Sequence, residues 1–259
     1  MSDLFSLADR CAFITGGTSG IGRAVAEAFV AQGATVVVAD ITDGTEIAGE
    51  IGASFVSVDV SNEDSVRNAL QEAAQLCGGK LDTVVLNAGV GDVGPTFEET
   101  DQTLIDKVTG INHWGVLYGL KHAPRYMNDG GSIISTSSMA AFINVPGAGV
   151  YSAGKRAITS MTEMSALELG ARGIRVNCIC PGYTATALGS GEEGQKLCEA
   201  FTALGRVATV NDMAGVYVFL ASAASSYMTG QSLKVDGGWD CGPTEKLLEL
   251  VTGDASAPA

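Results

Sequence analysis

Seven short runs of apolar, often β-branched residues alternate with longer amphipathic stretches along this chain of 259 residues. The strand-like runs are Cys11–Thr15, Thr35–Ala39, Ser54–Val58, Thr83–Leu86, Ser132–Thr136, Arg175–Ile179 and Ser232–Val235. The helix-like stretches include Ile21–Gln32, Asn62–Cys77, Thr103–Met127, Ser152–Ala171 and Val210–Ala223. Near-continuous apolar runs are typical of strands that a parallel sheet buries on both faces. The alternation therefore predicts a single α/β domain over residues 1–259, with a doubly wound seven-stranded parallel sheet and helices on both faces.

The composition restricts the partners that the chain can have. Its 15 basic and 29 acidic residues give a net charge of −14, which argues against nucleic acid and anionic membrane surfaces, since both demand basic residues. No apolar run approaches the roughly 20 residues of a bilayer span, and the first residues lack the pattern of a signal peptide. Six scattered cysteines and only two histidines fit no zinc spacing. We therefore expect a cytoplasmic protein with free thiols and no metal.

A glycine-rich segment follows the first predicted strand and leads into a predicted helix. Glycines allow the backbone to turn sharply and approach a phosphate, while the helix N-terminus offers unpaired N–H groups and the positive end of its dipole. This context predicts a dinucleotide-binding loop, with contacts from Gly16, Thr18, Ser19, Gly20, Ile21 and Gly22.

Asp40 follows the second predicted strand, close to the roughly 20-residue spacing at which an acid meets the adenosine ribose. A carboxylate there would repel a 2′-phosphate, and neither Ser19 nor Ile41 supplies a cation. We therefore assign Asp40 and Ile41 to the cofactor and expect NAD rather than NADP. The alternative is that Asp40 only caps the turn Asp40–Gly44.

Tyr151 and Lys155 are four residues apart at the start of a predicted helix, so they share one face. A tyrosine with its usual pKa of about 10 is a poor base at neutral pH, but a neighbouring ammonium group lowers that pKa. Ser138 ends the fifth predicted strand, where its hydroxyl can donate to a substrate oxygen. These three residues predict acid–base chemistry at an alcohol or a carbonyl.

In their order along the chain, these motifs resemble those of the short-chain dehydrogenase/reductase family, from about Leu7 to Trp239. The matches are Thr15, Gly16, Gly20 and Gly22 (TGxxxGxG), Asp59-Val60, Asn87-Ala88-Gly89, Asn112, Ser138, Tyr151, Lys155, Pro181-Gly182 with Thr186, Thr229-Gly230 and Val235-Asp236-Gly237-Gly238. The resemblance implies a Rossmann fold, a nicotinamide cofactor and a homotetramer packed through two long helices and the C-terminal segment.

The resemblance also implies the role of each residue. Ser138 and Tyr151 would hold the substrate oxygen, and Tyr151 would take the proton as hydride leaves for the nicotinamide. Lys155 would lower the Tyr151 pKa and hold the nicotinamide ribose, and Asn112 would order a water that relays the proton. Further cofactor contacts are implied for Asp59, Val60, Asn87, Ala88, Gly89, Tyr151, Pro181, Gly182, Thr184 and Thr186.

Three loops should form the substrate wall: Val90–Phe97, Met139–Val150 and Tyr183–Leu204. The second is rich in apolar side chains and the third in glycine, which predicts an apolar pocket and a mobile lid over residues 183–204. We assign substrate contacts to Met139, Ile143, Val145 and Tyr183. Residues 240–259 form a C-terminal extension, with a helical turn expected at Glu245–Val251 and disorder at Gly253–Ala259.

Together these features predict an NAD-dependent oxidoreductase that interconverts a hydrophobic or cyclic secondary alcohol and its ketone. One alternative is a 3-oxoacyl reductase. The net charge and Asp40 argue against its carrier-protein version, which binds an acidic partner and usually uses NADPH, whereas an acyl-CoA version with NAD stays open. Another is a catalytically silent NAD-binding sensor, which the intact Ser138, Tyr151 and Lys155 argue against. His113 is interpreted as a structural residue and Asp92 as a solvated loop acid.

Overall fold

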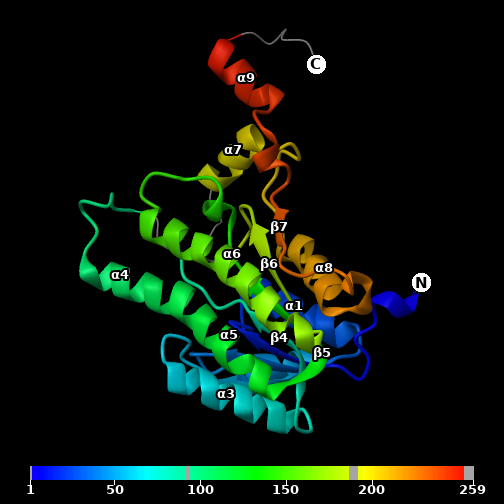
Figure 1. Cartoon of the computed structure of the whole chain (residues 1–259). Helices are drawn as coiled ribbons and strands as arrows, with labels where there is room; N and C mark the ends of the chain where they lie inside the picture. The colour runs from blue at the N-terminus through cyan, green and yellow to red at the C-terminus, as the bar shows by residue number, and fades with distance from the viewer. Residues whose placement is uncertain (1, 92–93, 187–191, 254–259) are drawn as a thin grey trace.

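A computed structural model of the chain describes residues 2–91, 94–186 and 192–253. These residues form one sheet of seven strands in the order β3-β2-β1-β4-β5-β6-β7, and every neighbouring pair is parallel (Figure 1). The strands are β1 (Cys11–Thr15), β2 (Thr35–Asp40), β3 (Ser54–Ser57), β4 (Leu81–Leu86), β5 (Met127–Thr136), β6 (Arg175–Pro181) and β7 (Ser232–Val235). The predicted doubly wound parallel sheet is confirmed.

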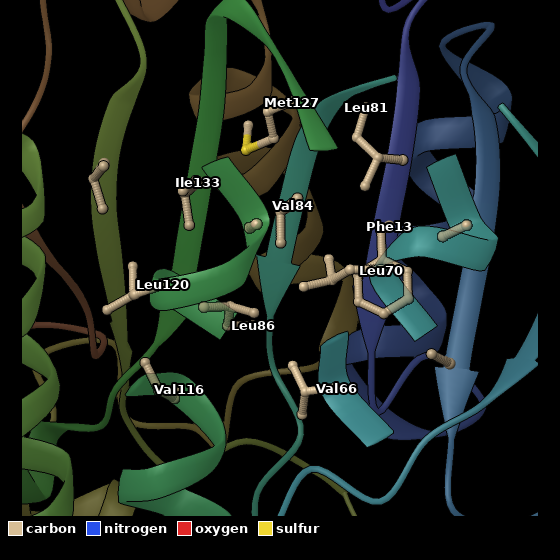
Figure 2. Close-up of a cluster of buried hydrophobic side chains, with 14 of the residues drawn as sticks. Phe13, Val66, Leu70, Leu81, Val84, Leu86, Val116, Leu120, Met127 and Ile133 are labelled. Atoms are coloured by element: carbon tan, nitrogen blue, oxygen red, sulfur yellow. The ribbon is translucent and has the colours of Figure 1, made fainter. Parts of the chain in front are cut away.

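Helices lie on both faces of the sheet, and others lie away from it (Figure 1). They are α1 (Gly20–Ala31), α2 (Thr45–Ile51), α3 (Glu63–Leu76), α4 (Gln102–Thr109), α5 (Gly115–Tyr126), α6 (Gly149–Leu169), α7 (Glu192–Phe201), α8 (Val210–Ala221) and α9 (Glu245–Thr252). Successive strand residues point to opposite faces. Phe13 therefore joins a core with Leu70 of α3 and Leu120 of α5, which Figure 2 shows, while Ile14 joins a second core beneath α1 and α8.

The helix predicted over Thr103–Met127 is interrupted and ends earlier. Between α4 and α5 the chain forms a π-helical turn, η2 (Gly110–Trp114), in which the Gly115 N–H donates to the Gly110 carbonyl five residues back. Such turns hold one residue more than an α turn and occur often at functional sites. The helix stops at Tyr126 because Met127 pairs with Leu81 at the start of β5. The π turn leaves Asn112 fully buried beneath the sheet edge.

The C-terminal segment is attached to α7, and α9 extends beyond it at the top of Figure 1. The Thr244 hydroxyl donates to the Ala200 carbonyl, and Lys246 pairs with Glu199 at 3.0 Å. The Leu204 N–H donates to the Gly237 carbonyl at 3.0 Å. Helix α9 matches the helical turn expected there. Residues 187–191, inside the expected lid, and 254–259, most of the expected disordered end, lie outside the described residues, as does Asp92.

Within the described ranges, no helix has both the length and the hydropathy needed to cross a bilayer.

Candidate active site

The candidate residues gather at one edge of the sheet because all seven strands are parallel. Gly16 follows β1, Asn87 follows β4, Ser138 follows β5 and Pro181 ends β6. In open α/β sheets, ligands bind outside this carboxyl edge. The sequence-predicted residues from four strands are thus brought together on the side where a ligand would bind.

The glycine loop has a shape that side chains would block. Gly16 and Gly20 have φ values of +64° and +52°, in the left-handed region that favours glycine. A Cβ at Gly22 would lie 2.0 Å from the Gly16 carbonyl oxygen, and one at Gly16 would lie 2.9 Å from the Ala88 Cα. Ser19 makes no side-chain cap at the start of α1. The loop is therefore a bare backbone cradle at a helix N-terminus, which suits a pyrophosphate.

Thr186 lies on the other side of this cradle. A Cβ at Gly20 would meet the Thr186 Cγ2 at 3.4 Å, so the segment after β6 comes within van der Waals reach of the glycine loop. Thr184 is buried and its hydroxyl donates to the Gly182 carbonyl at 3.1 Å. Gly182 itself packs against Asp236, where a Cβ would come within 2.9 Å of the Asp236 Cα. The segment after β6, which is expected to contact the nicotinamide, thus lies next to the glycine loop, which is expected to contact the phosphates.

Asp40 makes contacts that fit both interpretations of its role. Its Oδ2 accepts a hydrogen bond from the Thr18 hydroxyl at 2.6 Å, so the carboxylate lies beside the glycine loop. Its Oδ1 accepts from the backbone N–H groups of Ile41 and Thr42 at 2.9 and 3.4 Å, as a turn cap would. Both carboxylate oxygens thus already accept hydrogen bonds within the chain, and each has a further lone pair, so capping the turn does not exclude a bond to a ribose hydroxyl.

The two residues expected at the adenine end lie after β3. Asp59 accepts hydrogen bonds from the Ser61 N–H and hydroxyl at 2.9 and 2.6 Å. Val60 packs against Gly115 of α5, where a Cβ would come within 3.0 Å of the Val60 Cβ. These contacts fix the loop after β3 next to the start of α5.

Lys155 is buried at the centre of the site. Its side chain donates from Nζ to the Thr136 carbonyl at 2.9 Å, and the residue is only 4% exposed. Burial disfavours the ammonium form and lowers the Lys155 pKa to about 8. Gly89 lies beside the lysine ammonium group, and a side chain at that position would crowd it, since a Cβ there would lie 3.3 Å from the Lys155 Nζ. The lysine is thus held in place by the end of β5.

Tyr151 lies one helical turn before Lys155, whose Nζ is 5.6 Å from the centre of the tyrosine ring. Burial raises the Tyr151 pKa, and a hydrogen bond with Ser138 opposes that rise. The net direction in this chain is therefore upward, whereas sequence reasoning predicted a lowering by Lys155. A buried phenol that stays protonated is suited to donate to a carbonyl oxygen. When bound, an oxidised nicotinamide would supply the additional positive charge that favours the phenolate, and would accept hydride.

Ser138 begins a short 3₁₀ helix, η3 (Met139–Ala141). Its Oγ accepts a hydrogen bond from the Ala140 N–H at 3.1 Å, so its own proton is available for donation to a substrate oxygen or to Tyr151. Arg156 holds η3 in place by donating from Nε to the Ala141 carbonyl at 2.7 Å. Sequence reasoning missed Arg156, although it directly follows Lys155.

Asn112 anchors the loop after β4 with both polar atoms of its side chain. Its Oδ1 accepts from the Val90 N–H at 2.9 Å, and its Nδ2 donates to the Val90 carbonyl at 2.7 Å. A proton relay through a water on the Asn112 side chain would have to share these bonded atoms. The relay stays a prediction, and the structure adds a loop-anchoring role for Asn112.

A model of one protein family, described as "Enoyl-(Acyl carrier protein) reductase", matches residues 16–240. A solved short-chain type dehydrogenase/reductase from Mycobacterium marinum is 34% identical and superposes with a TM-score of 0.85, covering 93% of this chain and 99% of its own. The chain belongs to the short-chain dehydrogenase/reductase family. Members of this family use a nicotinamide cofactor, and the chain is accordingly an oxidoreductase acting on an alcohol or a ketone.

Other relatives of this dehydrogenase/reductase carry different names. A protein named momilactone A synthase, from Oryza sativa subsp. japonica, is 40% identical and covers 92% of both chains. A mitochondrial borneol dehydrogenase from Lavandula x intermedia is 39% identical and covers 90% of this chain and 91% of its own. A blue fluorescent protein from a metagenomic library, solved in complex with NADPH, is 32% identical with a TM-score of 0.85 over 90% of this chain and 99% of its own.

The dehydrogenase/reductase has an aromatic cluster beside the segment after β6. Tyr183 stacks on Trp239 of η6 (Trp239–Cys241) with ring centres 5.5 Å apart, and Phe201 of α7 lies 6.3 Å from the same indole. Of the other expected substrate residues, Met139 is buried in the core and Ile143 packs against it. Val145 lines a pocket together with Phe97 and Arg156 of α6. Sequence reasoning missed Trp239, although a tryptophan directly after a Gly-Gly turn was a signal.

His113 packs edge-on against Trp114, with ring centres 4.8 Å apart, and its structural role stays a prediction. The described parts of the chain hold no group of three or more metal-ligating side chains.

Proposed function

We propose that this enzyme interconverts a hydrophobic or cyclic secondary alcohol and its ketone, with NAD as the cofactor. The observation that carries the proposal is the meeting of Ser138, Tyr151 and the buried Lys155 beside a glycine cradle at one edge of the sheet. In oxidation, Ser138 donates to the substrate oxygen while Tyr151 accepts its proton. In reduction, Tyr151 returns a proton to the carbonyl oxygen. Below its pKa of about 8, the protonated Lys155 supplies positive charge that stabilises the phenolate.

The preference for NAD rests on Asp40. The Thr18 hydroxyl holds the Asp40 carboxylate beside the glycine loop, where it would accept from ribose hydroxyls and repel a 2′-phosphate. Arg23, the arginine of α1, forms ion pairs with Glu27 at 2.8 Å and with Glu50 at 3.4 Å. Its guanidinium group is therefore already engaged by two carboxylates and is not set aside for a 2′-phosphate. A relative solved with NADPH makes the direct comparison of the two cofactors necessary.

The substrate class rests on the aromatic cluster and on the relatives. The flat faces of Tyr183 and Trp239 suit an apolar ring, and aromatic walls of this kind bind ligands mainly by apolar contact. The name of the lavender relative gives borneol as its substrate, which supports an alicyclic alcohol here. The description of the family model names an acyl-thioester substrate, as the 3-oxoacyl alternative does, but an enoyl reductase reduces a carbon–carbon double bond and not a ketone. The net charge of −14 opposes an acidic carrier partner.

The proposal is tested by the rate of NADH appearance in mildly alkaline buffer, with a panel of cyclic and long-chain secondary alcohols. NAD and NADP are compared side by side. We expect turnover with NAD at least about tenfold better in kcat/KM than with NADP, and expect Asp40→Ala with Ile41→Arg to reverse that ratio, because one repulsive charge is removed and one attractive charge added. Asp43→Ala, at an exposed acid of the same loop, is the matched control and should leave the ratio unchanged.

Two results would contradict the proposal. Preferential use of NADP by the unmodified enzyme would reduce Asp40 to a turn cap. Selective, NADPH-dependent reduction of a 3-oxoacyl thioester, with no alcohol oxidised, would favour the acyl reductase.

We also propose that the enzyme is a homo-oligomer, with a tetramer as the expected state. Helix α6 and the turn η2 leave apolar side chains uncovered in the single chain, namely Trp114 (43% exposed), Met164 (57%) and Leu167 (80%). Exposed apolar side chains on neighbouring helices are typical of a surface buried against another subunit. Light scattering of the purified enzyme should give about four times the mass of one chain; a monomer mass at micromolar concentration would refute this.

A further inference from the structure

A chain of hydrogen bonds crosses the sheet from α8 to the glycine loop. It starts at Tyr217, which is fully buried in the core beneath α1 and α8. The Tyr217 hydroxyl lies 2.7 Å from the Thr136 Oγ1, which in turn lies 3.1 Å from the Asn87 Oδ1. The Asn87 Nδ2 donates to the carbonyls of Thr15 and Gly16 at 3.2 and 3.3 Å.

The direction of the protons in this chain is fixed by its ends. One end of the Asn87 side-chain amide faces the carbonyl oxygens of Thr15 and Gly16. Carbonyl oxygens only accept hydrogen bonds, so this end must be the nitrogen, and the amide oxygen must face Thr136. That oxygen only accepts, so Thr136 donates to it. Tyr217 must then donate to Thr136, and burial raises the Tyr217 pKa, which keeps its proton in place. Only this one set of donor and acceptor assignments gives every group in the series of hydrogen bonds a partner.

Thr136 connects this chain to the catalytic lysine. Its side chain holds Asn87, while its main-chain carbonyl accepts the hydrogen bond from the Lys155 Nζ at 2.9 Å. Asn87 is in close contact with the cradle, since a Cβ at Gly22 would lie 2.6 Å from its Nδ2. One residue therefore sets both the position of the phosphate loop and the position of Lys155.

We propose that Tyr217 and Thr136 are positioning residues, which fix the distance between the glycine cradle and the Lys155 ammonium and so determine how tightly the dinucleotide is held. This inference rests on the proposed dinucleotide-dependent function. Neither side chain would touch the substrate or the cofactor. Tyr217 acts from the face of the sheet opposite to α6, through Thr136.

The test uses the full-length enzyme and the binding of NADH, followed by nicotinamide fluorescence. Thr136→Val keeps the shape but removes the hydroxyl, which leaves the Asn87 oxygen and the Tyr217 hydroxyl without their partner. We expect the Kd for NADH to rise about tenfold, with a fall in kcat. Thr136→Ser restores the hydroxyl and should return the Kd to within about threefold of the unmodified enzyme, and Tyr217→Phe should give an intermediate Kd.

Ser132→Ala is the matched structural control. Ser132 is also buried in β5 and its hydroxyl also bonds α8, donating to the Leu220 carbonyl at 2.9 Å, but it lies four residues before Thr136, away from the site. This variant should lower the thermal midpoint without changing the Kd for NADH.

Three further results separate the possibilities. If Thr136→Val and Ser132→Ala both lower the thermal midpoint and neither changes the Kd, Thr136 is merely structural and the inference is wrong, while the proposed function stands. If Thr136→Ser does not rescue binding, the hydroxyl is not the group that acts, and the inference is again wrong. If the unmodified enzyme binds neither NADH nor NADPH, the proposed function fails and this inference with it.

Discussion

Replacement of Tyr151 by phenylalanine is expected to lower kcat for alcohol oxidation by about a thousandfold, because general acid–base groups contribute roughly 10²- to 10⁴-fold. The Kd for NADH should stay within about twofold, since the ring remains and the bond from Lys155 to Thr136 does not involve the phenol. The unmodified enzyme should also oxidise alcohols faster as the pH rises. Burial raises the Tyr151 pKa, so the reactive phenolate is scarce at neutral pH and its share grows with pH. The residual rate of the variant should lack this rise.

Tyr227→Phe is the control for this prediction, because Tyr227 is fully exposed and its phenol lies outside the candidate site. A Tyr151→Phe variant that turned over alcohol at the unmodified rate would remove the tyrosine from the chemistry. An enzyme that binds NADH but oxidises no alcohol of the panel, before or after the substitution, would favour the sensor interpretation.

Replacement of Gly22 by alanine is expected to weaken NADH binding by about a hundredfold or more and to lower the thermal midpoint. Helix propensity alone would favour alanine by about 1 kcal/mol in α1. The steric effect is larger, because the new Cβ would lie 2.0 Å from the Gly16 carbonyl oxygen. That atom is backbone and cannot rotate away, so the cradle itself must shift.

Gly49→Ala tests whether the effect is specific. Gly49 also lies within a helix, α2, but a Cβ there would meet nothing within 4 Å. This variant should bind NADH like the unmodified enzyme and be as stable or slightly more stable. Unchanged NADH binding by Gly22→Ala, measured beside this control, would show that the loop does not hold the dinucleotide.

The sheet could be predicted from the sequence because burial on both faces leaves a plain apolar signal. The strands at Cys11–Thr15 and Ser232–Val235 have the bounds expected. The π turn at η2 could not be predicted, since one additional residue in a turn hardly changes the apolar periodicity over Thr103–Met127. Its consequence is nevertheless large, because the turn contains Asn112.

The candidate site could be predicted only where its residues form local motifs. Tyr151 and Lys155 are neighbours on one helix, but the pair Thr136 and Tyr217 is separated by 81 residues and no local pattern connects them. The pKa of Tyr151 shows the same limit. A neighbouring charge can be inferred from spacing, whereas the depth of burial, which sets the upward direction, depends on the whole fold.

The aromatic cluster has a consequence for how enzymes of this kind diverge. The cradle and the residues proposed for proton transfer lie between Thr15 and Lys155, whereas Tyr183, Phe201 and Trp239 come from the last third of the chain. If the aromatic cluster contacts the substrate as proposed, substitutions in that last third would change which alcohol is accepted and leave the residues of proton transfer in place. The same holds for the two earlier loops of the expected substrate wall, Val90–Phe97 and Met139–Val150, which also lie outside the glycine loop and the Tyr151–Lys155 pair.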